Sequence, residues 1–438
     1  MTEKALELQQ KVKEKVEVLK RQGGFKILEG IVDGKKGIRD MNPKNEARRS
    51  AFLTDDDKAA KRRQLKAELE ALKELASSTT IAEGIELAQQ KSEKVSQTLK
   101  NNLREIFKNS RDLEKSYRLM DLFFRNAEEE EIRNLYFLNM PLEEFTSAEN
   151  SYLRSELAKH FDESFDRFSL EDNYSLFVIP GYLDGNLDYW SKMAAERRIT
   201  LVTDYTDELE FESIEDKIEE KKIAGSERYL ANTLVTCNYA VARKKNDGIE
   251  DDDLYLPMSI PLAGKMYSGN GIQPPAGKKH GKIDGVLGTR LPLLRTHVDK
   301  IDKMGMVPII YEKQWGTVAM SDTTLANESS DPDQKAIGVV RAKDWIAKVL
   351  LDYFNTLTFQ KYTGGLRTEI REQLNKFFDK ISGYDGLIES YEIIGPEKDP
   401  DNPQAVNVAI RVKPYFATKH YVIDYAGTEG KFKHEEKQ

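Results

Sequence analysis

Apolar positions recur at helical spacing through the first quarter of the chain. Between residues 3 and 22 they come at intervals of four, four and three residues, which predicts a helix ended by Gly23 and Gly24. The spacing returns over residues 57–75 and 81–107. Each apolar stripe is narrow, and such helices are marginal without a partner surface. We therefore expect residues 1–109 to form an arm and helices that pack on something else. The stripes contain Leu8, Val12, Val16, Leu19, Leu65, Leu69, Leu72, Val95, Leu99, Leu103 and Ile106.

From residue 110 onward, apolar runs alternate with helical spacing. "LEKSYRLMDLFFRN" predicts a helix, "IRNLYFLNM" a strand ending at Pro141, and "SYLRSELAKHFDESF" another helix. "YSLFVIPGYLDG" is a continuous apolar run stopped by Pro180 and Gly181, which is typical of a central strand covered on both faces. "LDYWSKMAAERR" and "ITLVTDY" then predict a helix and a strand. This order predicts a parallel strand pair with a right-handed crossover.

The remaining segments are a loop-rich stretch, a hairpin and a helix pair followed by strands. Residues 245–290 are rich in Gly, Pro, Asp and Lys, so we expect long extended loops there. "MGMVPIIYEKQWGTVAMSDTTL" predicts a hairpin. Helices are expected over residues 342–357 and 366–381, and strands at "LIESYEII" and "VNVAIRVKP". The last strand puts Val408, Ile410 and Val412 on one face. We expect three segments, at residues 1–109, 110–340 and 341–438, and a mixed α/β fold.

Composition narrows the possible partners. The 438 residues are 39% hydrophobic and 32% charged, with both signs intermixed and a net charge of −8, which argues against nucleic acid or an anionic membrane as partner. The single cysteine, Cys237, excludes an internal disulfide and lies in an apolar run that predicts a buried, inert thiol. There is no signal-peptide pattern and no apolar run long enough to span a membrane. We expect a cytoplasmic protein.

No catalytic, cofactor-binding or metal-binding residue can be assigned from motifs. In "GNGIQPPAGKKHG" five residues separate Gly271 from Gly277, and Lys279 stands where a P-loop has a hydroxyl. The acidic runs Asp55–Asp57 and Glu250–Asp253 lack the spacing of a calcium loop. We expect no enzyme, with one alternative left open, an α/β enzyme that binds a phosphorylated ligand through residues 265–285. The histidines are scattered without zinc or triad spacing, at His160, His280, His297, His420 and His434.

Six segments, taken in order over residues 110–427, resemble the large subunit of the type VI secretion system contractile sheath in its Bacteroidetes form. That family is related to phage tail sheath proteins. One departure is Tyr117, where the family usually has Trp, and another is the loop region around 265–285. The segments are "DLEKSYRLMDLFFRNA", "YSLFVIPGYLDG" with "DYWSKMAAERRITLVTDY", "DKMGMVPIIYEKQWGTVAMSD", "DWIAKVLLDYFNTLTFQKYTG", "LRTEIREQLNKFF" and "VAIRVKPYFATKHYVIDY".

The resemblance implies a contractile-sheath fold with an N-terminal helical arm, a central α/β domain and a C-terminal helix-plus-strand domain with an extended last strand. It implies a structural subunit that pairs with a small sheath subunit, stacks with copies of itself around an inner tube on a baseplate, and contracts to propel that tube. A recycling unfoldase would act on it afterwards. No cofactor is implied. A phage-like tail sheath that assembles alone is the alternative.

The resemblance and the apolar stripes of the predicted helices together indicate which residues contact each partner. It implies a small-subunit contact at Leu65, Leu69, Leu72, Leu99 and Leu103, and unfoldase recognition at Leu8, Val12, Val16 and Leu19. A coiled-coil contact is an equal alternative for that first helix. An inner-tube contact is expected at Arg367, Arg371, Lys376 and Lys380, unless these form an ordinary solvated helix face. The linker hinge is expected at Pro414, Tyr415 and Phe416. The inter-protomer strand is expected at Tyr421, Val422, Ile423, Asp424 and Tyr425.

Overall fold

The computed structural model describes residues 80–128, 135–147, 151–167, 173–269, 273–384, 386–402 and 404–419, with residues 63, 67–70, 73, 77 and 170. The chain divides into two compact units. A helical unit comprises residues 1–120 and 242–254, and a sheet unit comprises residues 121–241 and 255–438. The predicted helix over residues 3–22 and the apolar run 421–425 lie outside the described residues, as does most of the segment 57–75.

One long helix, α5 (Ile81–Ala127), replaces two predicted ones. The patterns over residues 81–107 and 113–126 belong to a single helix of 47 residues. The residues between them, "KNSRD", include no glycine or proline, so nothing ends the helix there. In the helical unit, α5 buries Leu103, Ile106 and Phe107 against Ile249 of the segment 242–254.

The segment after α5 is not the strand that the sequence predicts. The described part of the predicted strand, residues 135–140, forms no strand. Its side chains at Leu135, Tyr136 and Phe137 are exposed rather than paired in a ladder. An apolar run alone does not distinguish a strand from an extended surface segment, since a strand also needs a neighbour. Two helices follow, α6 (Leu142–Thr146) and α7 (Ser151–Phe165), and α7 is where the sequence predicts it.

The main sheet has six strands in the order β1-β2-β3-β8-β9-β6. Its first four strands run parallel, and β9 pairs antiparallel with β8 and β6. The predicted parallel pair and the predicted hairpin are therefore confirmed. The strands are β1 (Leu176–Ile179), β2 (Thr200–Asp204), β3 (Thr233–Cys237), β6 (Lys282–Ile283), β8 (Val307–Glu312) and β9 (Gly316–Ala319).

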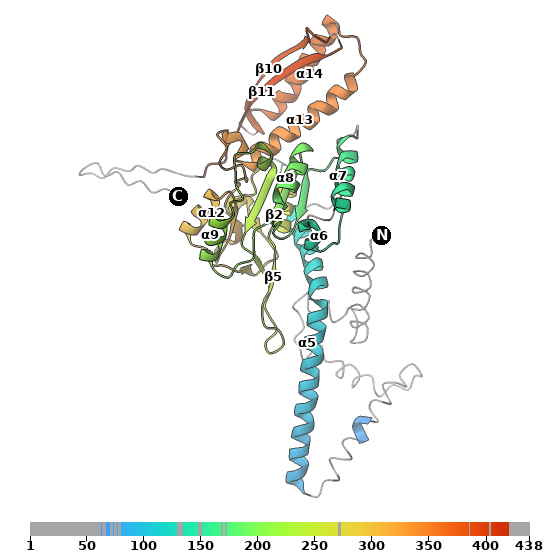
Figure 1. Cartoon of the computed structure of the whole chain (residues 1–438), viewed down its shortest axis with the longest axis vertical. Coiled ribbons are helices and arrows are strands. Elements are labelled where there is room, and N and C mark those ends of the chain that lie inside the picture. Colours follow the sequence, from blue (N-terminus) through green and yellow to red (C-terminus); the bar gives the residue numbers. More distant parts are fainter. Residues whose placement is uncertain are drawn as a thin grey trace, which may run out of the picture. The chain divides into compact units, whose positions relative to one another are not determined.

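The predicted position of the first strand is wrong, because β1 lies at the edge of the sheet and not at its centre. It is only half-buried over three of its four residues, whereas β2 is buried at all five. Helix α8 (Leu187–Glu196) connects the two strands, and Figure 1 labels it beside β2. Cys237 ends β3 and is buried, as predicted, and burial raises the pKa of its thiol to about 12.

The stretch 245–290 is more structured than the sequence predicts. It contains α10 (Ser259–Ser268) and the short helix α11 (Gly277–His280), besides β5 (Leu254–Leu256) and β7 (Gly288–Thr289). With β4 (Ala240–Arg243), the last two form a second sheet in the order β5-β4-β7. Proline at the third position of α10 lies in the first helical turn, where its missing N–H costs nothing. The composition that predicts loops therefore misses both helices.

Smaller elements complete the central region. They are α9 (Phe211–Glu220), the 3-10 helix η3 (Arg228–Asn232), α12 (Arg295–Lys303) and the 3-10 helix η4 (Pro332–Gln334). At Gly264 of α10, a Cβ atom would lie 2.6 Å from the Phe123 carbonyl oxygen near the end of α5. Glycine therefore permits the close approach of these two helices within the sheet unit.

The C-terminal layer is formed by α13 (Ile337–Leu357), α14 (Gly364–Ile381), β10 (Ile388–Lys398) and β11 (Val406–Pro414). Figure 1 shows the β10–β11 hairpin alongside α14. The predicted inward face of β11 is confirmed, since Val408, Ile410 and Val412 pack on a core that includes Leu374 and Phe378 of α14. Both helices are where the pattern predicts them, although α13 begins five residues earlier than its predicted start at residue 342.

Lys348 of α13 provides a pH test of this layer. Its Nζ donates to the Tyr174 carbonyl oxygen at 2.8 Å, and burial lowers the pKa of the side chain to about 8, although Asp344 acts to raise it. The unfolded chain therefore holds more protons than the folded chain between about pH 8 and 10.5, so the free energy of unfolding rises with pH across that window. We expect a rise of about 3 kcal/mol that Lys348→Met abolishes. Urea titrations of the wild type and of Lys348→Met at pH 7.5 and 10.5 measure this rise. An equal change in the free energy of unfolding with pH in the two proteins would contradict the prediction.

Candidate interaction surfaces

The carboxyl edge of the main sheet, where α/β proteins often bind ligands, is filled by a side chain of the chain itself. Asp204 ends β2 and is completely buried. One carboxylate oxygen accepts from Met258 N at 2.7 Å, Ser259 N at 2.8 Å and Thr236 Oγ1 at 2.5 Å. The other accepts from Gly181 N at 2.9 Å and Ser259 Oγ at 2.5 Å. The start of α10, where a phosphate would bind, already holds this carboxylate.

Three of the four lysines at residues 265–285, which suggest a phosphate site, have partners within the chain. Lys265 pairs with Glu128, and Lys282 Nζ lies 3.4 Å from Asp284 Oδ1. Lys278 lies over the Trp315 ring, with Nζ 5.3 Å from its centroid. Within the described ranges, no group of three His, Cys, Asp or Glu side chains is arranged to hold a metal ion. The geometry does not favour the phosphorylated-ligand alternative.

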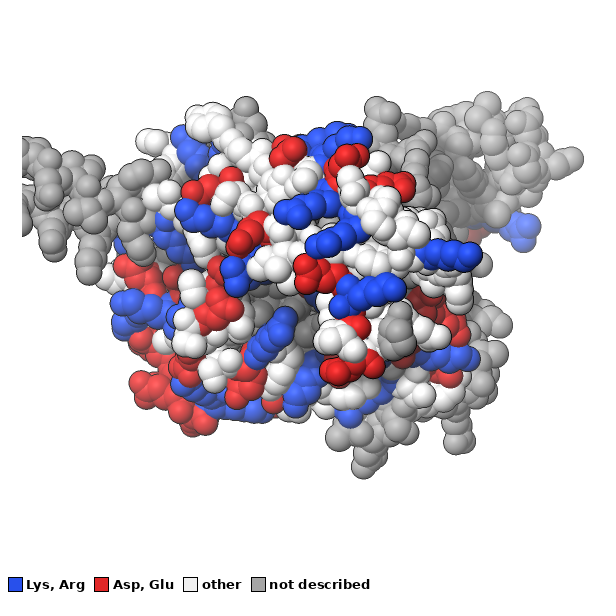
Figure 2. Space-filling view, turned by 90° about the horizontal axis from the view of Figure 1, so that it is seen from above, with Lys and Arg blue, Asp and Glu red and all other residues white. Residues whose placement is uncertain are grey.

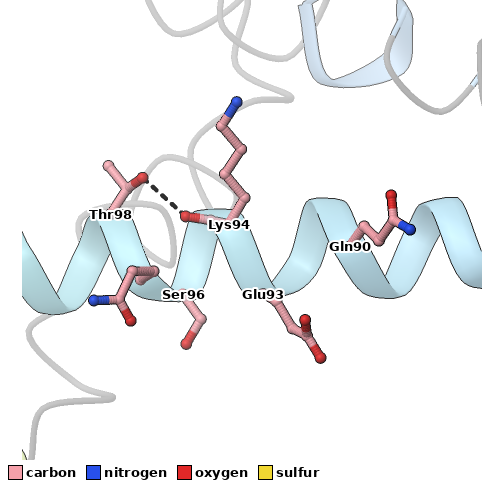
Figure 3. Close-up of a pocket in the computed structure, with 6 residues that line it drawn as sticks. Gln90, Glu93, Lys94, Ser96 and Thr98 are labelled. Atoms are coloured by element: carbon pink, nitrogen blue, oxygen red, sulfur yellow. Dashed lines mark hydrogen bonds between the residues drawn. The ribbon is translucent and has the colours of Figure 1, made fainter.

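A shallow pocket lies along the first part of α5 (Figure 3). Its lining side chains all belong to that helix and point to different sides of it, so they do not converge on a ligand. The dashed line in Figure 3 is a bond from Thr98 Oγ1 to the Lys94 carbonyl oxygen, 2.8 Å, within the same helix. We interpret the pocket as part of a helix surface. It is lined by Gln90, Glu93, Lys94, Ser96, Gln97 and Thr98.

The apolar side chains predicted to contact a small subunit lie in different surroundings. Leu69 is exposed, Leu99 is half-buried and Leu103 is only 3% exposed, in the intrachain cluster with Ile249. Leu65 and Leu72 lie outside the described residues, as do the four residues predicted for unfoldase recognition. The large apolar side chains that α5 leaves exposed on its first half are instead Ile85 and Val95.

A buried charge cluster fixes the segment 242–254 against α5 inside the helical unit. The Arg243 guanidinium makes paired bonds of 2.8 and 3.0 Å to the Glu114 carboxylate and of 2.7 and 2.9 Å to the Glu250 carboxylate. Burial acts to raise the pKa of Glu250, but hydrogen bonds from Arg243 and Asn246 outweigh it and hold that pKa below its usual value. Two-pronged pairs of this kind specify a single geometry. Glu250, the first residue of the run "EDDD", therefore helps to hold the segment 242–254 on α5.

The basic residues of α14 are all exposed, whereas Ile370 and Phe378 of the same helix are buried. Arg367 Nη2 lies 3.1 Å from Glu397 Oε1. The helix carries four basic and three acidic residues, so its surface is nearly balanced in charge. Figure 2 shows the same mixture of Lys and Arg with Asp and Glu over the face that it presents. The candidate tube-contact residues are Arg367, Arg371, Lys376 and Lys380.

The predicted hinge lies where the chain leaves the C-terminal layer. Pro414 is buried and is the last residue of β11. Tyr415 and Phe416 are both exposed, and the Tyr415 hydroxyl donates to the Gly383 carbonyl oxygen at 3.0 Å. Four residues later, Lys419 contacts a polar pocket of the central region, which the sequence pattern does not reveal. The predicted inter-protomer strand, Tyr421 to Tyr425, lies outside the described residues.

Three family models match the chain almost from end to end. Residues 12–103 match the TssC/VipB-like N-terminal region, residues 105–327 match the type VI secretion system TssC/VipB central domain, and residues 336–438 match the TssC/VipB-like C-terminal domain. A comparison with curated proteins finds no match. Among the described residues, no helix is both long and apolar enough to cross a membrane.

Solved structures of contractile systems are distantly similar to the chain. The anti-feeding prophage helical sheath in its contracted state shares 15% identity, with a TM-score of 0.45 over 70% of this chain and 81% of that one. The prophage baseplate shares 15% identity, with a TM-score of 0.41 over 54% of this chain. The sheath complex of the extracellular contractile injection system PVC, in its contracted state, shares 13%, with a score of 0.40 over 53%. The chain spans 64% of each of the latter two. At these scores, the assignment rests on the family models.

Proposed function

This chain belongs to the TssC/VipB family of type VI secretion proteins, and on that premise we propose that it is the large, structural subunit of a contractile sheath. The observation that carries the proposal is the match of three family models to residues 12–103, 105–327 and 336–438. The sheath would polymerise around an inner tube in the cytoplasm and contract to propel the tube for protein secretion. A structural role is consistent with the carboxyl edge of the main sheet, where the Asp204 side chain takes the place in which a ligand would bind.

We propose that the chain pairs with a small sheath subunit through its first helices. The support is the unfinished apolar stripe of α5, with Ile85 and Val95 exposed and Leu99 half-buried. Leu69, which precedes α5, is exposed as well. Helices with one exposed apolar stripe bind by laying that stripe against a partner. Leu103 would not touch the small subunit itself, because its side chain packs on Ile249. It would instead hold α5 in position next to this contact.

Neighbouring copies would be linked by their C-terminal arms. The run Tyr421 to Tyr425 is apolar and close to the terminus, and a short apolar strand gains its backbone hydrogen bonds by joining the edge of another sheet. Contraction would then be a change between two packings of rigid subunits joined by these arms, and the free energy would be stored in the extended packing. No bond-making step by this chain is required.

Three further contacts complete the proposal, with the inner tube, a recycling unfoldase and a baseplate. The exposed basic residues of α14, from Arg367 to Lys380, are candidates for the inner tube, because their side chains are open to solvent on a helix that other residues fix in the core. The helix predicted over residues 3–22 is the candidate for a recycling unfoldase. A baseplate would start the assembly. None of these contacts needs a cofactor.

Expression of the chain with and without its small partner tests the pairing. We expect tubes only when both proteins are present, because the α5 stripe stays uncovered otherwise. Negative-stain electron microscopy of both preparations gives the answer. Regular tubes from this chain alone would favour a phage-like tail sheath that needs no partner.

A further inference from the structure

Lys419 is held by four oxygen atoms from a different part of the sheet unit. Its Nζ lies 2.6 Å from Thr323 Oγ1, 3.1 Å from Asp322 Oδ1, and 3.4 Å from both Asp302 Oδ1 and Ser321 Oγ. Asp302 belongs to α12, and the other three residues follow β9. We call the four residues Asp302, Ser321, Asp322 and Thr323 the arm pocket, and residues 415–419 the strap. An ammonium group has three donors and no acceptor, so it suits a pocket made only of oxygen acceptors.

The arm pocket is rigid for reasons that do not involve the strap. The hydroxyl groups of Ser321 and Thr323 both donate to Asp302 Oδ1, and Ser321 Oγ accepts from Thr323 N at 3.0 Å. Each hydroxyl oxygen keeps at least one lone pair that can accept from an ammonium group. Backbone bonds fix the loop, because Thr323 bridges to Ala336 and Ile337 N donates to the Asp322 carbonyl oxygen at 3.0 Å. A site whose acceptors are already oriented loses little entropy when its ligand enters.

Asp322 shows that the arm pocket requires a cation. Its side chain is only 3% exposed, and over the part of the chain that the structure describes its ion pair is with Lys419. A carboxylate buried to this degree is destabilising unless it is paired. Lys419 itself is 37% exposed, so the strap lies over the pocket and inserts its charged end.

We propose that the arm pocket is the docking site for the C-terminal arm of the same chain, and that it fastens the arm at Lys419. The strap is then fixed at both ends, by Pro414 at the end of β11 and by Lys419 in the pocket. If the chain is a sheath subunit that exchanges its last strand, as proposed above, the part free to reach a neighbour begins at residue 420. This differs from a hinge at Pro414, Tyr415 and Phe416, which would free the strap as well.

Proteolysis of the purified full-length chain tests the anchor. Tyr415 and Phe416 are both exposed and are the chymotrypsin sites of the strap, so cleavage there, followed at Phe416, reports how often the strap leaves the surface. We expect Lys419→Met to speed cleavage at Phe416 about tenfold, the factor that corresponds to about 1.4 kcal/mol of lost anchoring. The matched control is Lys413→Met, which removes an exposed lysine paired with Glu389 on β10 and should leave the rate unchanged. Equal rates for wild type and Lys419→Met would overturn the proposal.

A second variant separates the anchor from a general loss of structure. Asp322→Asn removes the buried charge that Lys419 neutralises, so in that background Lys419→Met should change the cleavage rate less than twofold. Two residues that act through one contact are non-additive in this way. Full additivity of the two substitutions would count against the arm pocket. Circular dichroism of each variant checks that the remaining fold is intact.

Zero-length carbodiimide cross-linking then tests whether the anchor is kept within one chain. The reagent joins Lys419 to a carboxylate of Asp302 or Asp322 only when they are in contact. With isotopically light and heavy chains mixed before assembly, we expect the cross-linked peptides to be purely light or purely heavy. Mixed pairs would show that the pocket takes the arm of a neighbour, contrary to the proposal. The proteolysis experiment does not require sheath assembly. It therefore tests the anchor even if the chain proves not to be a sheath subunit.

Discussion

A chain that ends at residue 420 is expected to fold and to bind its small partner but to form no sleeve. The deletion removes the apolar run Tyr421 to Tyr425 and leaves the Lys419 anchor in place. If this run is the strand that each copy adds to its neighbour, its loss removes the covalently tethered link between subunits, and assembly should fall below detection. Electron microscopy and sedimentation of the co-expressed complex measure the effect.

The matched control for this deletion is a chain that ends at residue 427. It lacks only the charged tail "TEGKFKHEEKQ" and keeps the apolar run. Tubes should form from the control at wild-type abundance. Tubes of normal length from the chain that ends at residue 420 would contradict the strand-exchange proposal, whether or not the control forms tubes.

Asp204→Ala is expected to be among the most destabilising substitutions in the sheet unit. Five donors lose their acceptor at once, namely the backbone N–H groups of residues 181, 258 and 259 and the hydroxyl groups of Thr236 and Ser259. A buried donor without a partner costs about 1–3 kcal/mol, so even partial rearrangement leaves a loss of at least about 4 kcal/mol. The midpoint of urea unfolding measures it.

Ser259→Ala is the control for Asp204→Ala. It removes one of the five donors and leaves the carboxylate with the other four, so we expect a loss of about 1 kcal/mol. A wild-type unfolding midpoint for Asp204→Ala would show that the carboxylate is not what joins β1, β2, β3 and α10.

The C-terminal layer could be predicted from the sequence because its signals are local. Alternation in β11 put Val408, Ile410 and Val412 on one face, and the structure packs those three side chains on α14. The end of α14 at Ser382 and Gly383 was also predictable, since Gly383 has a positive φ of +100°. Periodicity and end signals determine such elements before any tertiary contact is made.

The errors arise where the deciding contact is distant in sequence. Helix α10 starts in a loop-like composition because its first N–H groups are satisfied by Asp204, more than 50 residues earlier. The edge position of β1 depends on strand order, which apolar content does not encode. Leu103 has the spacing of a free stripe, yet Ile249 covers it from the segment 242–254. The same holds for Lys419, whose acceptors lie 96–117 residues earlier.

An electron micrograph of the purified chain with its small partner tests the central claim most directly. The account predicts long, regular tubes of sheath around a hollow or tube-filled centre. Monodisperse heterodimers that form no tubes under any condition would contradict it.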